Sequence, residues 1–259
     1  MLITKEVAQK LETCIKNTHI EVTKNYPQGQ YQEIGSGVAC FSGFDSFLSQ
    51  SIGWGFNCNL KQMAAQLTQI EAFYRKLSHP RVDLEISPYV GTELIEFLSA
   101  RGYKVSEINN VSVLDLRTYK QQDYALEQGE IKIISVEAVD DWAKRIAMGF
   151  EYPDAQEHFS CYARAQGVST FGAYIDSNLV AGATISVNQD ICDLGVTSTL
   201  HAFRGQGLQK KLLLARLNYA KKLGLAVATV TTEPGTVSDL NVQKIGFHCA
   251  YTRIKMTFE

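Results

Sequence analysis

The segment Arg204-Gly205-Gln206-Gly207-Leu208-Gln209 restricts the possible folds more than any other part of this chain. It follows an extended stretch, residues 193–200, and precedes apolar residues that recur every three or four positions, which predicts a helix. Glycines in a turn between a strand and a helix let the backbone approach an anion closely. The first N–H groups of the helix lack partners within it and can donate to that anion. We therefore predict that residues 204–209 bind a phosphate group.

Basic residues gather around this loop, although the whole chain carries a net charge of only −2. Residues 194–232 include no Asp or Glu, and they hold six basic residues: Arg204, Lys210, Lys211, Arg216, Lys221 and Lys222. Such a local bias favours an anionic ligand. A capped surface helix with a solvated basic face would give the same pattern, and this alternative stays open.

The loop matches neither of two common phosphate-binding motifs. It lacks the Gly-Lys-Ser/Thr of a Walker A sequence, and the pattern Gly-x-Gly-x-x-Gly fails at Lys210. The spacing from Arg204 to Gly207 instead resembles the donor loop of the GNAT acyltransferase superfamily. The resemblance implies that this loop holds the pyrophosphate of acetyl-CoA. Gln209 stands where the family often has a small residue, so we expect it to crowd the loop.

A second motif lies downstream at Ser238-Asp239-Leu240-Asn241-Val242-Gln243-Lys244-Ile245-Gly246-Phe247. It resembles the family's Ser-x-x-Asn…Lys-x-Gly-Phe segment, which implies that Asn241 and Lys244 contact the cofactor. Gly246 is typical of a left-handed helix end, and Phe247 of its apolar anchor. The segments 234–236 and 250–253 also resemble bacterial two-domain GNAT proteins of largely undefined substrate.

The 259 residues have room for two domains of about 120–130 residues each. Residues 121–130 are polar and serve as the predicted linker, which gives an N-terminal domain at 1–120 and a catalytic domain at 131–259. In the second domain we expect helices at 140–150 and 155–165. The expected strands are 131–136, 170–175, 179–187 and 191–199, followed by the donor loop, its helix, a strand at 226–232, a short helix and a last strand. This order matches the mixed α/β fold of GNAT enzymes.

The first half has a similar rhythm. We expect helices at 2–24, 60–77 and 93–100, and strands at 37–41, 47–52, 82–86 and 105–116. Gly91 and Gly102 repeat the eleven-residue spacing of Gly235 and Gly246. This predicts a tandem GNAT-like architecture with an intact C-terminal unit and a degenerate N-terminal one. In the N-terminal unit, residues 52–57 stand at the expected position of the cofactor loop. They retain two glycines but include no Arg. Chance spacing of common helix ends remains the alternative.

The resemblance implies that an amine attacks the thioester directly. The strand before the loop would pair with the cofactor arm at the point where Gly195 opens the strand. The backbone N–H groups that could donate to the thioester carbonyl belong to five residues: Val196, Thr197, Ser198, Thr199 and Leu200. Many relatives carry a tyrosine acid where this chain has Val242. Tyr251 is the substitute acid and Glu151 the candidate base. A packed strand tyrosine and a surface carboxylate are the alternatives.

Composition narrows the remaining classes. No apolar run reaches the roughly 18 residues that span a bilayer, and the first residues lack a signal-peptide core. Six scattered cysteines without a Cys-x-x-Cys pair predict a reducing, cytoplasmic setting and no metal site. Nothing is basic or aromatic enough to predict nucleic-acid binding.

We therefore expect a cytoplasmic, acetyl-CoA-dependent N-acetyltransferase acting on a small-molecule or peptide amine, with no membrane partner and with homodimerisation open. One rival is a non-catalytic CoA-binding module, for which Val242 marks lost chemistry. The other uses a different acyl donor, either a longer-chain acyl-CoA or an aminoacyl-tRNA. The lack of a large basic surface weakens the tRNA version.

Overall fold

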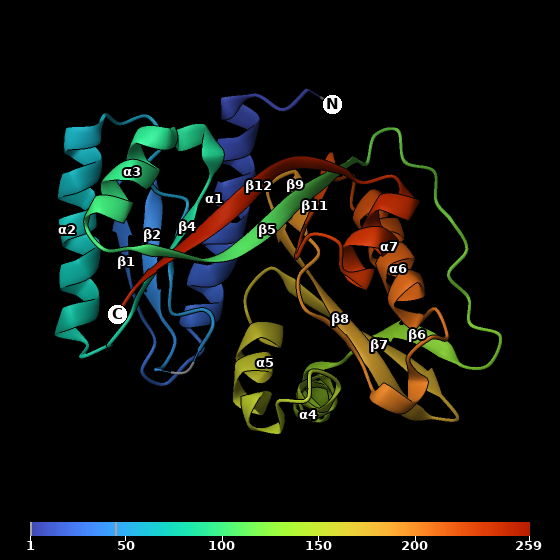
Figure 1. Cartoon of the computed structure of the whole chain (residues 1–259). Helices are drawn as coiled ribbons and strands as arrows, with labels where there is room; N and C mark the ends of the chain where they lie inside the picture. The colour runs from blue at the N-terminus through green and yellow to red at the C-terminus, as the bar shows by residue number, and fades with distance from the viewer. Residues whose placement is uncertain (1, 45) are drawn as a thin grey trace. The chain divides into compact units, whose positions relative to one another are not determined.

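The computed structural model describes residues 2–44 and 46–259, and the chain divides into two compact units (Figure 1). The first contains the residues up to Ser112 together with Thr232–Leu240 and Cys249–Glu259. The second contains Val113–Thr231 and Asn241–His248. The last strand, which we expected in the second domain, therefore clusters with the first unit. The proposed domain boundaries at 120 and 131 stay a prediction.

The first unit is built on a mixed sheet with the strand order β1-β2-β3-β4-β12-β5. Its elements are α1 (Lys5–Thr23), β1 (Gln30–Ile34), β2 (Gly37–Phe41), β3 (Ser51–Ile52), α2 (Leu60–Lys76), β4 (Val82–Ile86), α3 (Thr92–Ala100), β5 (Lys104–Asp115) and β12 (His248–Phe258). Strand β12 pairs antiparallel with β4, with Lys255 opposite Glu85. The strand order places β12 between β4 and β5, and in Figure 1 the red β12 crosses the green β5.

Two strand predictions in this unit need correction. The strand expected at 47–52 shrinks to the two residues of β3, because Ser49 closes a turn: its N–H donates to Ser46 O at 3.0 Å. The sequence analysis missed β1, whose first four residues are all exposed and therefore give no alternating apolar pattern.

Helices cover both faces of the first sheet. Ile15 and Ile20 of α1 pack on Val38, Cys40 and Ile52. The strand residues Ala39, Phe41 and Leu84 belong to another cluster. This cluster also contains Leu67 of α2 and Leu94 of α3. Since successive strand residues point to opposite faces, α1 lies on one face and α2 and α3 lie on the other.

The second unit has the strand order β5-β11-β9-β8-β7-β6, with β10 paired to β8. Its elements are β6 (Glu130–Ile133), α4 (Val139–Gly149), α5 (Gln156–Ala163), β7 (Val168–Ile175), β8 (Asn178–Asn188), β9 (Ile191–Asp193), β10 (Thr197–Thr199), α6 (Leu208–Lys222) and β11 (Val227–Thr232). Helix α7 (Val237–Ile245) contributes its second half to this unit. The structure confirms the expected helices and hairpin strands of this half, with small shifts at their ends.

The second sheet is also covered on both faces. Helix α6 packs its apolar stripe, including Leu208, Leu212 and Ala215, against Ala183 and Cys192. On the other face, Trp142 of α4 is fully buried, and its indole N–H donates to Phe171 O at 2.9 Å. A Cβ on Gly182 would collide with that indole, so the glycine makes room for it. Among the described residues, no helix is both long and apolar enough to cross a membrane.

The repeated glycine spacing corresponds to a repeated local structure. Gly91 precedes the nine-residue α3, and Gly235 precedes the nine-residue α7. The glycines that follow the two helices, Gly102 and Gly246, have φ angles of +92° and +109°. Each is followed by a buried aromatic residue and a long strand. The repeat therefore extends to backbone conformation, whereas descent of the first unit from a working GNAT unit stays a prediction.

The placement of β12 leads to a prediction about fragments. A cut in residues 121–130 separates β12 from its partner β4. Because this strand contributes the buried Tyr251, Arg253 and Met256 to the first unit, we expect fragment 1–120 to be unfolded when expressed alone. Co-expressed fragments should associate and regain the circular dichroism and cooperative melting of the intact chain. A stable, cooperatively melting fragment 1–120 on its own would contradict this.

Candidate donor and reaction site

The donor loop has the geometry of an open anion site. Gly205 and Gly207 have φ angles of +81° and +75°, and a Cβ built on either meets nothing within 4 Å. Gly207 is the N-cap of α6 and has no side chain that could accept a hydrogen bond from the start of the helix. The space beside both glycines is open, and the partial positive charge at the start of α6 favours an anion there.

A loop of similar backbone shape in the first unit is closed. Gly53 and Gly55 have φ angles of +75° and +87°. A Cβ on Gly55 would lie 3.2 Å from the Val90 side chain, so this loop is packed. At the start of α2, Asn59 accepts from Gln62 N at 3.0 Å, and its own N–H donates to Gln62 Oε1 at 2.8 Å. This capping box occupies the helix end that an anion would need.

Arg204 ties the donor loop to the end of α4. Its Nη2 donates to Gly149 O at 2.7 Å and lies 3.3 Å from Glu151 Oε1, while its Nε donates to Thr199 O at 3.4 Å. The structure thus brings together the predicted pyrophosphate ligand Arg204 and the candidate base Glu151. Both side chains are about half exposed or more, so solvent screens the ion pair and its contribution to stability is small.

The basic residues predicted around the loop differ in their surroundings. Arg216 is buried, with burial lowering its pKa to about 10, and it donates to Thr184 O and Leu212 O. Lys221 donates to the carbonyls of Leu116 and Arg117. These two cations hold the unit together. Lys210 and Lys211, in the first turn of α6, remain beside the loop.

The two sequence motifs meet in the second unit. Asn241 Nδ2 donates to Gln209 Oε1 at 2.6 Å. We expected Gln209 to crowd the loop, and its side chain instead forms a hydrogen bond with the second motif. This bond links the start of α6 to α7. Lys244 is exposed on α7. Val242 is buried in the core of this unit, so the position that often carries a tyrosine in relatives is apolar here.

The strand expected at 191–199 is broken at Gly195 into β9 and β10. Leu194 N donates to Thr229 O of β11 at 2.8 Å, whereas β10 pairs only with β8 among the described residues. Val196 O accepts from Thr184 N, and Leu200 N donates to Val180 O.

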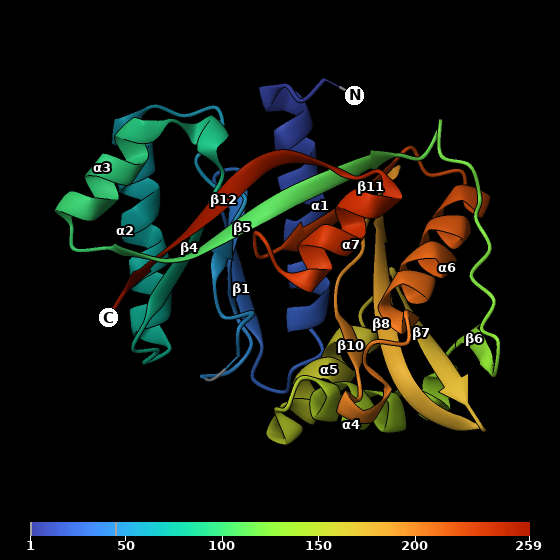
Figure 2. The same cartoon turned by 45° about the vertical axis from the view of Figure 1, so that its right-hand side comes forward.

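Backbone groups alternate in direction along a strand, so the N–H groups of Thr197 and Thr199 point away from β8, towards the open edge. Figure 2 shows β10 beside β8. Of the five predicted donors at 196–200, these two backbone N–H groups have the direction that an added strand requires.

Helix α4 holds β10 in this position. Ser198 Oγ donates to Ile146 O at 3.1 Å, and a Cβ on Gly149 would collide with the same hydroxyl. The sequence analysis did not identify Gly149, because a glycine at a helix end is also typical of an ordinary helix stop.

The Tyr251 side chain is packed inside the first unit. It is buried and donates to Glu12 Oε1 at 2.7 Å, and burial raises its pKa well above its usual value. Arg253 Nε lies 3.3 Å from the same carboxylate oxygen. The role of Tyr251 as general acid stays a prediction, and these contacts support the packed alternative.

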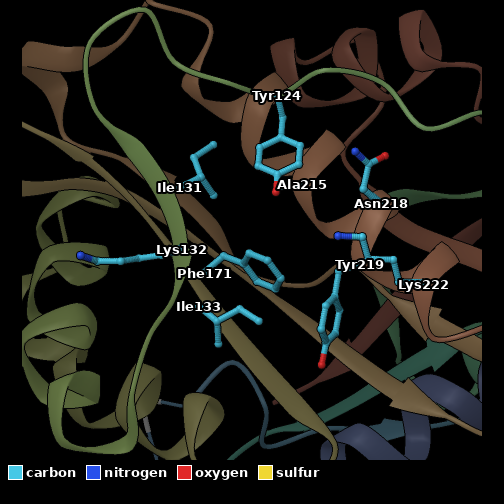
Figure 3. Close-up of a pocket in the computed structure, with 9 residues that line it drawn as sticks. All are labelled: Tyr124, Ile131, Lys132, Ile133, Phe171, Ala215, Asn218, Tyr219 and Lys222. Atoms are coloured by element: carbon cyan, nitrogen blue, oxygen red, sulfur yellow. The ribbon is translucent and has the colours of Figure 1, made fainter.

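A cavity of about 250 Å³ lies beside the C-terminal half of α6 (Figure 3). Its lining is Tyr124, Ile131, Lys132, Ile133, Phe171, Ala215, Asn218, Tyr219 and Lys222. In Figure 3 the Lys132 side chain points away from the Phe171 ring, and this amine pairs with Glu130. The cavity includes none of the donor-loop residues, so we keep it separate from the candidate site.

Residues 136–248 match the sequence model of the acetyltransferase (GNAT) family. They form a GNAT domain. No curated protein matches the sequence. The match covers the broken strand, the donor loop and the Asn241 motif, and it supports an enzyme of the N-acyltransferase class.

Solved structures extend the fold likeness beyond the GNAT domain. A GCN5-related N-acetyltransferase from Kribbella flavida has a TM-score of 0.69 at 12% identity, with 95% of each chain covered. A tandem GNAT protein from the clavulanic acid biosynthesis pathway has a TM-score of 0.64 at 16% identity, covering 93% of this chain and 87% of its own. A GCN5-related N-acetyltransferase from Sphaerobacter thermophilus has a TM-score of 0.62 at 14% identity, covering 81% and 71%. The GNAT-type fold class is thereby confirmed.

The open loop predicts the effect of a side chain at Gly207. Valine there should abolish the stabilisation by acetyl-CoA, about 2.7 kcal/mol at 100 times Kd, because it occupies the phosphate's approach. Gly224, at the other end of α6, has the same φ of +75° and equally open surroundings. Gly224→Val is therefore a matched control for backbone strain and should retain the full ligand shift in a thermal melt. A full ligand shift in Gly207→Val, equal to that of the control, would exclude the loop as the phosphate site.

The environment of Tyr251 predicts a loss of stability. Tyr251→Phe removes the donor to the buried Glu12 carboxylate and should cost about 1–3 kcal/mol in urea unfolding. We expect kcat to fall by less than about tenfold, with acetyl-CoA affinity unchanged. A hundredfold fall in kcat would instead identify Tyr251 as the acid.

Proposed function

We propose that this protein transfers an acetyl group from acetyl-CoA to the amine of a small molecule or peptide. The observation that carries the proposal is the open glycine loop at the start of α6, next to β10, which pairs with β8 alone among the described residues. The first feature suits a pyrophosphate, and the second suits an extended amide-containing arm that pairs like an added strand. The residues present therefore fit the donor that GNAT enzymes generally use.

The proposed reaction depends mainly on positioning. The loop at 204–207 and the first turn of α6 would hold the pyrophosphate, with Lys210 and Lys211 beside it. The N–H groups of Thr197 and Thr199 would bind the arm and the thioester carbonyl. The amine nitrogen then attacks the carbonyl carbon, the carbon–sulfur bond breaks, and the amide and free thiol leave. Holding both reactants in line supplies much of the rate acceleration.

The ion pair between Arg204 and Glu151 supports Glu151 as the candidate base. Glu151 follows α4 with a φ of +64°, and Arg204 belongs to the donor loop. We propose that this contact positions the carboxylate next to the bound donor, where it can accept a proton through water. The six scattered cysteines, without a Cys-x-x-Cys pair, support a reducing compartment such as the cytoplasm.

The main rival is a CoA-binding module without chemistry, and the burial of Val242 favours it. Thiol release with a panel of primary amines distinguishes the two. The transferase should release CoA with at least one amine, and Gly207→Val should not. Binding of acetyl-CoA without thiol release for any amine would support the module. Parallel assays with longer-chain acyl-CoA test the alternative donor.

The contrast between the two glycine loops predicts the stoichiometry of binding. Calorimetric titration should give one CoA per chain, because Val90 and the Asn59 capping box close the loop of the first unit. Gly207→Val should reduce the measured heat to that of dilution. A stoichiometry of two, or binding that survives in Gly207→Val, would show that the first unit is also a donor site.

A further inference from the structure

The break in the strand at Gly195 is lined by two hydroxyl groups. A Cβ built on Gly195 would lie 2.5 Å from Tyr162 Oη and 3.2 Å from Thr184 Oγ1. Tyr162 comes from α5 and Thr184 from β8, so two elements direct a hydroxyl to the same backbone position. The missing side chain of Gly195 is what leaves room for them.

These hydroxyl groups lie in a buried polar environment. Tyr162 is 6% exposed, and the Thr184 side chain is fully buried with no hydrogen-bond partner for Oγ1 in the described structure. Behind them, the Arg216 guanidinium donates to Thr184 O at 2.8 Å. Burial lowers the pKa of Arg216, and Asp193, Cys192 and Tyr162 act in the opposite direction. The Tyr162 oxygen therefore lies within electrostatic reach of a fixed cation.

The other candidate acids are less well placed. Val242 has no proton to donate, and Tyr251 belongs to the first unit, where it contacts Glu12. Tyr162, in contrast, belongs to the second unit and reaches the break between β9 and β10. This is the point where the open edge of β10 begins.

We propose that Tyr162 is the proton donor to the leaving thiolate, which rests on the acetyl transfer proposed above. When the carbon–sulfur bond breaks, sulfur keeps the electron pair and takes the phenolic proton. The nitrogen that attacked loses its own proton through water to Glu151, and release of that proton through solvent allows the phenol to be restored. The sum is amine plus thioester giving amide plus thiol, with no other reactant.

The first test compares two buried tyrosine hydroxyls. Tyr162→Phe should lower kcat by about 10²–10⁴-fold and leave the Kd of acetyl-CoA unchanged. It should also reduce the solvent deuterium isotope effect on single-turnover acetyl transfer towards one. Tyr119→Phe is the matched control, because Tyr119 is buried in the same unit but its hydroxyl donates to Asn218. It should keep the wild-type kcat and isotope effect.

A second variant keeps the proposal testable if Tyr162→Phe folds poorly. Gly195→Ala places a methyl group against the Tyr162 oxygen and should cause a similar loss of kcat. In the double variant the oxygen is gone, so the two losses should not add. Losses below tenfold, an unchanged isotope effect or additive losses would each overturn the proposal. Thiol release by the wild-type enzyme is measured first, so failure of the acetyl transfer itself is recognised separately.

Discussion

The geometry of the second unit depends on one departure from regular pairing, the break between β9 and β10. Leu194 still donates to β11, whereas β10 turns away and pairs only with β8 among the residues that the structure describes. A strand edge inside a sheet normally has a partner, because unpaired backbone groups away from water are costly. The break therefore needs other contacts to persist, and α4 supplies them. Its carbonyls at Ile146 and Gly149 accept from Ser198 and Arg204.

The same contacts hold the predicted donor loop in place. Arg204 connects the loop to the end of α4 and to β10, so the loop and the strand are fixed by one side chain. Hydrogen bonds of this kind contribute about 0.5–1.5 kcal/mol each, which is enough to favour one loop arrangement. An ordered loop binds its anion without a further entropy cost for closing. Gly53 and Gly55 show that the backbone shape alone is insufficient, since packing by Val90 fills the equivalent space.

Sequence reasoning predicted the elements with strong periodicity and the two motifs, because apolar spacing and glycine positions are local properties of a chain. It overestimated the number of cations available to an anionic ligand. Counting charges cannot show that Arg216 is buried and donates to backbone carbonyls. It assigned β12 by chain order, whereas pairing with β4 depends on contacts between residues about 170 positions apart, such as Lys255 and Glu85. Tyr162 gave no signal, because its importance comes only from the position of α5 over Gly195.

The missing side chain of Gly195 affects the hydroxyl groups next to the strand as well as the strand itself. A side chain at this position would meet Tyr162 and Thr184, so a residue that closed the space would also displace the hydroxyl groups. The opening for the donor and the access of a proton donor therefore depend on the same missing Cβ. This coupling offers a physical reason why an apolar Val242 is tolerated in α7. If α5 supplies the proton from the other face of the strand, α7 is free to use that position for packing in the core of the unit.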